Sequence, residues 1–422
     1  MTKSGEGFII EARMAAKVSL VIMAGSNEGS EVERMVAGAR RAITLDVVAK
    51  ALSAGCFDRI VVATNSVPLA EALRGEPVHV ELDAPGEEFH FGRRLRELVE
   101  KYDIERLFYI GGGSGALLPA EEMARIAEAI SNADGLAIAN NFYSTDFVAF
   151  APARAIEAFE PPAFDNDLGW LLAEEAGLPC RELPRNAATQ LDVDTPADLM
   201  TLRVHPAVAP YTRRYLDSLE LDTAHIEQAL KFLTDRDAQV LVAGRVSAST
   251  WAYLESETAC QVRILAEERG MRASGRQTRG EVRSLLGFYL EKVGVERFFE
   301  TLGELCQAAF LDSRVLLAHL GLWPPTADRF YSDLRQPERI SDPWLRRFTE
   351  AAISAPIPIV LGGHSLVSGG LYALVEAAWA RGEDLPRRVE PLRHWDFLTL
   401  TQESYFDRAA TSPTATNVTT DP

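Results

Sequence analysis

The first half of this 422-residue chain alternates short apolar runs with segments of helical periodicity, and this alternation is what most constrains the fold. Apolar runs of strand length stand at 18–25, 59–65, 77–82 and 106–112, followed by "GLAIAN" and "FVAFAP". Helical patterns lie among them at 44–55, 93–102 and 119–130. Strand and helix in turn predict a mostly parallel sheet with helices on both faces. Ligands bind such sheets outside the carboxyl ends of the strands, so the turns at Gly25, Asp83 and Gly111–Gly115 are expected along one edge.

The pattern changes near "VHPAVAPY" (204–211), where prolines break the chain. From there the segments are chiefly helical, interrupted by two short apolar runs at 238–244 and 356–363. We therefore predict a Rossmann-like α/β domain followed by a mainly α-helical domain. The predicted parts are an N-terminal extension 1–16, the α/β domain 17–205, the helical domain 206–397 and a Pro/Thr-rich, disordered tail 398–422.

Charge and composition argue against nucleic-acid and membrane partners. The net charge of −18 would repel phosphate backbones, so nucleic acid is not an expected partner. No apolar run approaches the roughly 20 residues that span a bilayer, and the N-terminus lacks the character of a signal peptide. The four cysteines form no CxxC pair and are expected to be reduced thiols. A cytoplasmic protein without membrane partners is the expectation.

A glycine-containing loop, "MAGSNEGSEVERMVAGARRAITL" (23–45), follows the first predicted strand, with Arg34, Arg40 and Arg41 behind it. Backbone amides of small residues and forked guanidinium groups can hold phosphate oxygens. It matches neither a P-loop nor a GxGxxG pattern. Taken alone, it fits an exposed acidic loop with surface arginines equally well.

Four stretches in order carry a family resemblance: "VIMAG", "RMVAGARRAITLDVVAKAL", "FHFGRRLRELVEKYDIERLFYIGGGSGALLPAEEM" and "LDVDTPADLMTL". Together they resemble the MobA-like NTP transferases of the nucleotide-diphospho-sugar transferase (A-type glycosyltransferase) fold, over about residues 17–205. The last stretch is the most specific. The resemblance implies a nucleotidyltransferase that takes a nucleoside triphosphate or nucleotide conjugate and a phosphorylated small-molecule acceptor, with Mg²⁺ as cofactor.

The resemblance also implies roles for individual residues. Arg34 and Arg41 fall where the family has basic residues on the triphosphate, as catalytic groups. Metal ligation falls to Asp192 and Asp194, although Asp194 could equally be the N-cap of the helix that follows. Nucleotide contacts are expected from the first-strand turn, the base and ribose region and the Gly-rich turn: Ala24, Gly25, Ser26, Asp83, Phe89, Gly92, Gly112, Gly113 and Ser114.

Two departures from the family pattern matter. The aspartate of its Asp-x-Pro turn, which binds Mg²⁺, is replaced by Gly113-Ser114-Gly115. Either another carboxylate takes over, or the glycines hold a phosphate without metal. The carboxylates that could take over are Asp146, Asp165, Asp167 and Asp192. The first loop is also longer than in the family and carries Glu28, Glu31 and Glu33, which would repel a triphosphate unless they point away.

No family resemblance is found for 206–397, which we expect to supply acceptor contacts or the surface of a homo-oligomer. Ser365 in "GGHSLVSGG" stands on a strand–turn–helix pattern similar to a nucleophile elbow, although helix capping explains it as well. Three hypotheses remain: a nucleotidyltransferase impaired by the missing aspartate, a non-catalytic nucleotide- or phosphate-ligand-binding scaffold that keeps the fold, and, remotely, a serine hydrolase.

Overall fold

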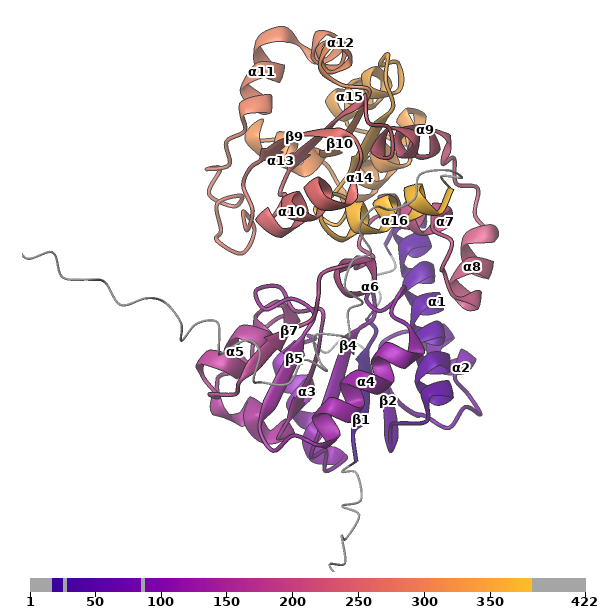
Figure 1. The fold of residues 1–422 in the computed structure, drawn as a ribbon, viewed down its shortest axis with the longest axis vertical. Coiled ribbons are helices and arrows are strands. Elements are labelled where there is room, and N and C mark those ends of the chain that lie inside the picture. The colour runs from indigo at the N-terminus through magenta and orange to yellow at the C-terminus, as the bar shows by residue number, and fades with distance from the viewer. Residues whose placement is uncertain (1–16, 26–28, 85–87, 382–422) are drawn as a thin grey trace, which may run out of the picture. The chain divides into compact units, whose positions relative to one another are not determined.

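The first half of the chain forms a seven-stranded sheet in the order β3-β2-β1-β4-β6-β5-β7 (Figure 1). The strands are β1 Ser19–Met23, β2 Arg59–Thr64, β3 His79–Leu82, β4 Leu107–Gly111, β5 Leu136–Ala139, β6 Phe147–Ala151 and β7 Cys180–Glu182. β6 runs antiparallel to both neighbours, and the other pairs are parallel. The carboxyl ends of the six parallel strands therefore share one edge, which confirms the predicted sheet.

Helices cover this sheet on two sides. Its seven helices are α1 Glu31–Ala54, α2 Val67–Ala72, α3 Phe91–Lys101, α4 Ala120–Ser131, α5 Leu168–Glu174, α6 Ala187–Gln190 and α7 Pro196–Val204, with 3₁₀ turns at Ala153–Ala158 and Asp165–Asp167. Leu95 and Leu98 of α3 pack with Val21 and Tyr109 in one buried cluster. Because side chains alternate across a strand, Leu20 and Ile110 point to the opposite face, where α1 and α4 lie.

The helix α1 is longer than its apolar periodicity predicts, since it begins at Glu31 rather than at 44. The hydroxyl of Ser30 accepts from the N–H of Glu33, and the Glu33 carboxylate accepts from the N–H of Ser30, a reciprocal capping box. The helix ends at Gly55, in the left-handed conformation expected of a C-terminal cap. Arg34, Arg40 and Arg41 consequently lie on a helix, and the prediction of a loop through residue 45 is wrong.

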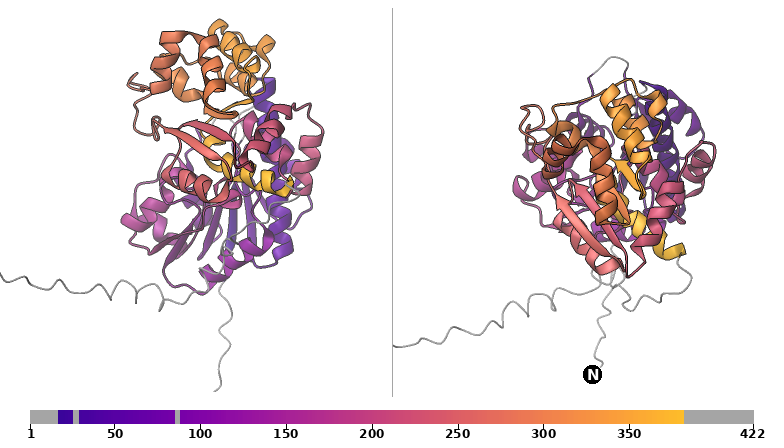
Figure 2. Two further views of the ribbon diagram at one scale, coloured as in Figure 1. Left: turned by 45° about the horizontal axis from the view of Figure 1, so that its top comes forward. Right: turned by 90° about the horizontal axis from the view of Figure 1, so that it is seen from above.

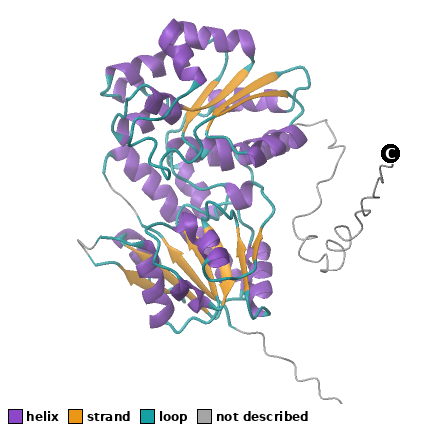
Figure 3. Ribbon diagram, turned by 90° about the vertical axis from the view of Figure 1, so that its left-hand side faces the viewer, coloured by secondary structure: helices purple, strands orange, loops and turns teal. Residues whose placement is uncertain are grey.

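The second half also contains a sheet, so the prediction of a mainly α-helical domain is only partly confirmed. Four parallel strands run in the order β11-β10-β8-β9. They are β8 Gln239–Gly244, β9 Gln261–Ala266, β10 Ala308–Asp312 and β11 Ile359–Gly362. Helices pack around these strands as they do around the first sheet (Figure 3). The two sheets follow one another along the chain, as the colours in Figure 2 show.

The helices of this half account for most of its regular structure. They are α8 Pro210–Asp217, α9 Ala224–Leu233, α10 Ala248–Glu257, α11 Leu285–Val293, α12 Val295–Leu305, α13 Ser313–His319, α14 Thr326–Asp333, α15 Pro343–Ile353 and α16 Leu371–Arg381, with short helical segments at Pro337–Arg339 and Leu366–Gly370. β9 and β10 lie in stretches of the second half that we predicted to be helical. β10 is fully buried, and a short apolar run of that kind looks alike in a strand and a helix.

The computed structural model describes residues 17–25, 29–84 and 88–381. The predicted extension 1–16, the tail 398–422 and residues 382–397 lie outside these ranges. Helices α1 and α7 of the first half share a buried cluster with the second sheet, in which Val32, Ala197 and Met200 pack with residues of β8 and β10. The Asp46 carboxylate on α1 accepts the N–H groups of Tyr211 and Thr212 at the start of α8. The division into two domains stays a prediction. No helix in the described ranges is long and apolar enough to span a membrane.

Candidate functional site

The turns that follow β1 and β4 meet at the carboxyl edge of the first sheet. Met23 and Gly111 are register partners, and the Gly112 N–H donates to the Met23 carbonyl at 2.9 Å. A Cβ on Gly112 would lie 2.7 Å from Ala24 Cα, so only glycine allows this approach. The predicted convergence of the two turns is confirmed. We call this edge the first rim, comprising residues 23–25, 111–115 and 192–195.

A carboxylate does reach the Gly-rich turn, and it comes from the closing motif. A Cβ on Gly113 would lie 2.4 Å from the Asp192 Oδ1, and that oxygen accepts the Ser114 hydroxyl at 2.9 Å. The Val193 N–H donates to the Gly113 carbonyl, which ties the closing motif to the turn. Glycine at 113 therefore makes room for Asp192. The carboxylate that residue 113 lacks is thus supplied at the rim by Asp192.

Other acids gather at the same place. Asp146 precedes β6 and is bonded by the Asn140 amide at 2.9 Å, while Asp165 accepts the Tyr109 hydroxyl at 2.7 Å. Burial, followed by the charges of Asp192 and Asp165, raises the pKa of Asp146 well above its usual range. Burial and the charge of Asp194 raise the pKa of Asp192 to about 7, against the opposing effects of Arg40 and the Ser114 hydroxyl. Burial is the main cause of these shifts, and repulsion among the carboxylates adds to it.

Arg40 is a cation that lies among these acids, whereas the family resemblance singled out Arg34 and Arg41. From α1 its guanidinium donates to the Val193 carbonyl at 2.7 Å and to Asp194 Oδ1 at 2.5 Å. Burial acts to lower the pKa of Arg40, but the charges of Asp194, Asp192 and neighbouring acids raise it. The available signal was helical spacing: with α1 beginning at Glu31, residues 40 and 41 point about 100° apart, and Arg40 is the one that reaches Val193 and Asp194.

The two arginines singled out by the resemblance lie differently. Arg34 donates from Nη1 to the Gly29 carbonyl at 2.8 Å, near the start of α1. Arg41 lies within the electrostatic reach of Tyr215 on α8: burial raises the pKa of that phenol, and the charge of Arg41 opposes the shift. A Cβ on Gly38 would clash with this Tyr215 hydroxyl, so the helix face containing Gly38 and Arg41 packs on α8. Catalytic roles for Arg34 and Arg41 stay predictions.

Some of the residues expected to contact a nucleotide are exposed, and others already bond to protein groups. Gly25 is exposed, and nothing lies within 4 Å of a Cβ placed there; Ser26 is outside the described residues. Asp83 follows β3 on the same edge and bonds Arg94 at 3.1 Å. The Gly92 N–H is used by the Pro162 carbonyl at 2.9 Å. Phe89 is 58% exposed.

The Gly-rich turn offers few free amides for a metal-free phosphate nest. The N–H groups of Gly111, Gly112 and Ser114 already donate to the carbonyls of Asp146, Met23 and Gly111 respectively. The Gly113 N–H makes no hydrogen bond to any described residue. The geometry of the turn therefore favours carboxylate support by Asp192 over a nest of amides.

Two acidic residues that the sequence placed in the first loop, Glu31 and Glu33, are directed away from the rim. Glu31 forms an ion pair with Arg339 at 2.7 Å, and Glu33 closes the capping box at Ser30. The hydrogen bonds to Ser30 are also the main cause of the lowered pKa of Glu33. Glu28 lies outside the described residues. Glu31 and Glu33 thus serve the helix start and the contact with the second half, so they do not oppose a phosphate at the rim.

The closing motif also contacts the carboxyl end of β11. The N-cap of α7 is Thr195 rather than Asp194, and its capping partner Asp198 accepts the Ser365 hydroxyl at 2.7 Å. A Cβ on Gly369 would lie 1.9 Å from the Gln190 carbonyl oxygen, so glycine permits this packing. Ser365 is buried and bonded to a carboxylate, and its hydroxyl makes no hydrogen bond to a described histidine. The hydrogen bond from Ser365 to Asp198 therefore joins the second half of the chain to the first.

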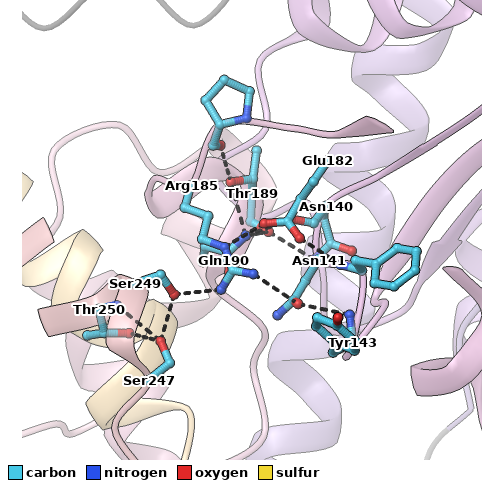
Figure 4. A network of polar contacts seen from close by, with 12 residues as sticks. Asn140, Asn141, Tyr143, Glu182, Arg185, Thr189, Gln190, Ser247, Ser249 and Thr250 are labelled. Atoms are coloured by element: carbon cyan, nitrogen blue, oxygen red, sulfur yellow. Dashed lines mark hydrogen bonds and ion pairs between the residues drawn. The ribbon is translucent and has the colours of Figure 1, made fainter. Parts of the chain in front are cut away.

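A second connection runs through Arg185 (Figure 4). Its guanidinium donates to Glu182 at 2.6 Å, to Asn141 at 3.3 Å and to the Ser249 hydroxyl at 2.7 Å. Ser249 lies at the start of α10, just after β8. The loops at the carboxyl ends of both sheets are therefore held against one another by side-chain hydrogen bonds.

The chemistry of the carboxylate donors at the first rim suits a hard divalent cation. Asp192 and Asp194 supply carboxylate oxygens, and the raised pKa of Asp192 marks a site where added positive charge would be stabilising. Within the described ranges, no three side chains of His, Cys, Asp or Glu are grouped to hold a metal ion. A Mg²⁺ ion with two protein carboxylates would take its other ligands from water and substrate phosphates, which is its usual mode.

A cavity of about 240 Å³ lies elsewhere, beside Ile104–Arg106 and Ala151–Arg154. These residues stand at the amino end of β4 and the carboxyl end of the antiparallel β6, hence at the edge opposite the first rim. The cavity shares none of the residues that the family resemblance singles out. We therefore place the candidate site by the convergence of side chains at the rim.

Comparisons with solved structures find nucleotidyltransferases. A nucleotidyl transferase from Methanothermobacter is 18% identical, with 48% of this chain and 99% of that chain covered and a TM-score of 0.35. A cytidylyltransferase from Leptospira borgpetersenii is 12% identical, with 48% and 92% covered and a TM-score of 0.37. A Mycobacterium tuberculosis protein solved with manganese is 16% identical, with 48% and 100% covered and a TM-score of 0.30. No protein-family model and no curated protein matches this chain.

Proposed function

We propose that the first half binds a nucleoside triphosphate at the first rim and transfers its nucleotidyl group to a phosphorylated small molecule. The observation that carries this proposal is the placement of Asp192 against Gly113, beside the converging turns of β1 and β4. The order of the four sequence stretches supports the same chemistry. The low TM-scores of the solved structures carry no part of the argument.

In the proposed reaction, an oxygen of the acceptor phosphate attacks the α-phosphorus of the triphosphate. A new P–O bond forms, the bond from the α-phosphorus to the bridging oxygen breaks, and pyrophosphate leaves with that electron pair. The turn at Ala24–Gly25 brings the backbone close to the phosphates, because a side chain at Gly25 is absent. Catalysis of this kind depends mainly on position and charge.

Arg40 fixes the acids of the rim. By bonding Asp194 and the Val193 carbonyl, it holds the closing motif in place and leaves the Asp192 carboxylate beside the Gly-rich turn. Mg²⁺, held by Asp192 and Asp194, would neutralise charge on the phosphates when bound. We retain Arg34 and Arg41 as proposed contacts to the triphosphate, as the family resemblance implies.

The test is pyrophosphate release by the full chain, measured with a panel of NTPs and sugar or cofactor phosphates, with and without Mg²⁺ or Mn²⁺. We expect metal-dependent release that falls about 100-fold or more in Asp192→Asn, which keeps the shape of the side chain and removes its charge. Asp134→Asn is the matched control, since Asp134 is exposed and lies beside the cavity at the opposite edge of the sheet. Release that is equal in wild type and Asp192→Asn would overturn the proposal.

A second candidate function is a non-catalytic nucleotide-binding scaffold. The observation that favours it is the bond from Arg40 to Asp194 at 2.5 Å, by which a protein cation already engages one of the two proposed metal ligands. In that case an NTP would raise the thermal unfolding midpoint equally with and without a divalent cation, and no pyrophosphate would appear. Metal-dependent stabilisation together with turnover would rule the scaffold out.

A further inference from the structure

The second sheet has its own place for a ligand. The chain passes from β8 outward to β9 and then returns across β8 to form β10 on the other side. The order of strands therefore reverses between β8 and β10. In parallel α/β sheets, ligands bind outside the carboxyl ends of the strands at such a reversal. The residues there are Arg245, directly after β8, and Asp312, the last residue of β10.

Arg245 is held rigidly at this point. Its Nε and Nη2 donate to the two carboxylate oxygens of Asp312, at 2.5 and 3.1 Å. The Asp312 side chain is fully buried, and although burial opposes it, Arg245 holds the pKa of Asp312 below its ordinary value. A Cβ on Gly244 would lie 2.4 Å from Asp312 Cβ, and Gly244 has a φ of 122°, so glycine is needed for this pairing.

The pairing with Asp312 uses one edge of the Arg245 guanidinium and leaves the other available. Nη1 makes no hydrogen bond to any described residue, and the side chain remains 12% exposed. Arg314 lies two residues after the end of β10, and its guanidinium differs from that of Arg245. Its guanidinium is consumed by both oxygens of Asp333, at 2.5 and 2.6 Å, and by the Gly362 carbonyl. Arg314 is structural, whereas Arg245 has unused donors.

His364 adds a second unused group, just after β11. Its imidazole makes no hydrogen bond to any residue in the described ranges, yet it is only partly exposed. Burial, and then the charge of Arg245, lowers its pKa to about 4. At neutral pH the ring is uncharged and has one N–H donor and one acceptor nitrogen open. The charged groups within its electrostatic reach are Arg245, Asp312, Asp194 and Arg269.

This place faces the first rim. A Cβ on Gly363 would lie 3.3 Å from Thr195 Cγ2, and Asp194 contributes to the electrostatic environment of His364. The same Asp194 is bonded by Arg40 of the first rim. We call the edge with Gly244–Arg245, Asp312 and Gly362–His364 the second rim. An anion on it would lie next to the closing motif of the first half.

We propose that Arg245 and His364 form a second ligand site, on the second rim, that binds the phosphate group of a phosphate monoester. A fixed guanidinium edge beside a neutral imidazole matches phosphate oxygens, because it supplies directed N–H donors with a positive charge. We further propose that this monoester is the acceptor, which rests on the proposed function. The acceptor oxygen would then approach the nucleotide from the second half of the chain.

The binding site is tested on the full chain by calorimetric titration of inorganic phosphate and of glycerol phosphate, without nucleotide. The variants are Arg245→Lys, which retains the charge that Asp312 needs, and His364→Ala, which removes no hydrogen bond. We expect each to weaken phosphate binding about tenfold, because Lys lacks the guanidinium fork and Ala lacks both ring nitrogens. Arg236→Gln, an exposed arginine of the same half, is the control and should bind as wild type does.

Arg40→Gln on the first rim separates the two sites. It should reduce NTP binding and leave the binding of glycerol phosphate unchanged. Absence of phosphate binding at millimolar concentration, or binding that Arg40→Gln abolishes while Arg245→Lys and His364→Ala do not alter it, would overturn the second site. If instead phosphate binds as expected and no pyrophosphate is ever released, the second site stands and the proposed transferase reaction fails. Unfolding midpoints of all variants show that each is folded.

Discussion

The two rims are built on similar sheet edges and have opposite electrostatic character. At the first rim, Arg40 is the arginine that bonds Asp194, and burial, together with the charges of neighbouring carboxylates, raises the pKa values of Asp192 and Asp146. At the second rim, one buried aspartate orients an arginine, and that cation lowers the pKa of the aspartate. An arginine–aspartate pair is thus present at both rims, but the first rim favours a bound cation and the second rim favours a bound anion.

The difference follows from how many acids share each arginine. Arg245 has a bidentate partner to itself, so Asp312 is satisfied and the guanidinium retains an open edge. Arg40 bonds Asp194 and a backbone carbonyl, and it cannot neutralise Asp192 and Asp165 as well. A nucleotide with its cation and an anionic acceptor would meet complementary surfaces, each close to the closing motif. Electrostatic complementarity of this kind fixes orientation more than it adds affinity.

Replacement of Arg40 should have the largest effect, because it removes the cation that distinguishes the first rim from an uncompensated cluster of acids. In Arg40→Ala, Asp194 and Asp192 lose their cation, and we expect nucleotidyl transfer to fall about 100-fold or more, because the rim is no longer positioned. Pyrophosphate release under saturating NTP measures this. Arg74→Ala, an exposed arginine near β3, is the matched control and should retain full activity.

The stability of Arg40→Ala gives an independent readout. We expect the free energy of unfolding to fall by about 2 kcal/mol, since partly buried carboxylates remain without a partner. Added Mg²⁺ or Mn²⁺ should restore part of that loss if the acids share a cation site. A variant that is as stable and as active as the wild type would mean that the acids of the first rim are satisfied by solvent.

Gly113→Ala should sharpen the assignment of Asp192. The added methyl group would sit 2.4 Å from the present position of Asp192 Oδ1, so the carboxylate must move. We expect a loss of about 1–3 kcal/mol in the free energy of unfolding and about tenfold weaker metal-dependent NTP binding. Gly25→Ala, where nothing lies within 4 Å, should leave stability unchanged. Equal stability losses in the two variants would show that neither reflects contact with Asp192.

Much of the first rim was predictable from the sequence, because strand ends and glycine turns are local features. The alternation of strands and helices placed Ala24, Asp83 and Gly112 on one edge, and the register of β1 and β4 confirms it. Asp192 was one of four carboxylates that the sequence offered as a partner for the turn at Gly113, but the sequence could not choose among them. Asp192 is about 80 residues away in sequence, and only the folded chain shows that its carboxylate fills the space a side chain at 113 would occupy.

The contact of Arg40 with the closing motif was missed for a local reason. The capping box of Ser30 and Glu33 is visible in the sequence, and counting helical turns from it would have separated Arg40 from Arg41. The sheet of the second half was hidden because β9 is partly exposed at an edge and runs into charged residues, while β10 continues directly into α13. Strand and helix periodicity cannot be separated over five or six residues.

The smallest expected effect is the pH dependence that His364 brings to the second rim. Burial and the charge of Arg245 lower its folded-state pKa to about 4, below the ordinary 6.5. Between these two pH values the unfolded chain binds a proton that the folded chain does not. The contribution to stability is therefore complete above pH 6.5 and is lost as the pH falls toward 4. We expect a loss of roughly 1–2 kcal/mol from this group, less than the full shift implies because the ring is partly exposed.

The measurement is urea unfolding at a series of pH values between 7 and about 4.5 for wild type and His364→Gln. The variant should lose less stability than the wild type across this window, with the exposed His79→Gln as control. Because Asp312 and Arg245 retain their charges over this range, the difference between the two curves isolates the imidazole. Parallel curves for wild type and His364→Gln would show that the ring titrates normally. In that case His364 would carry positive charge at mildly acidic pH, and phosphate binding at the second rim would strengthen there instead of remaining constant.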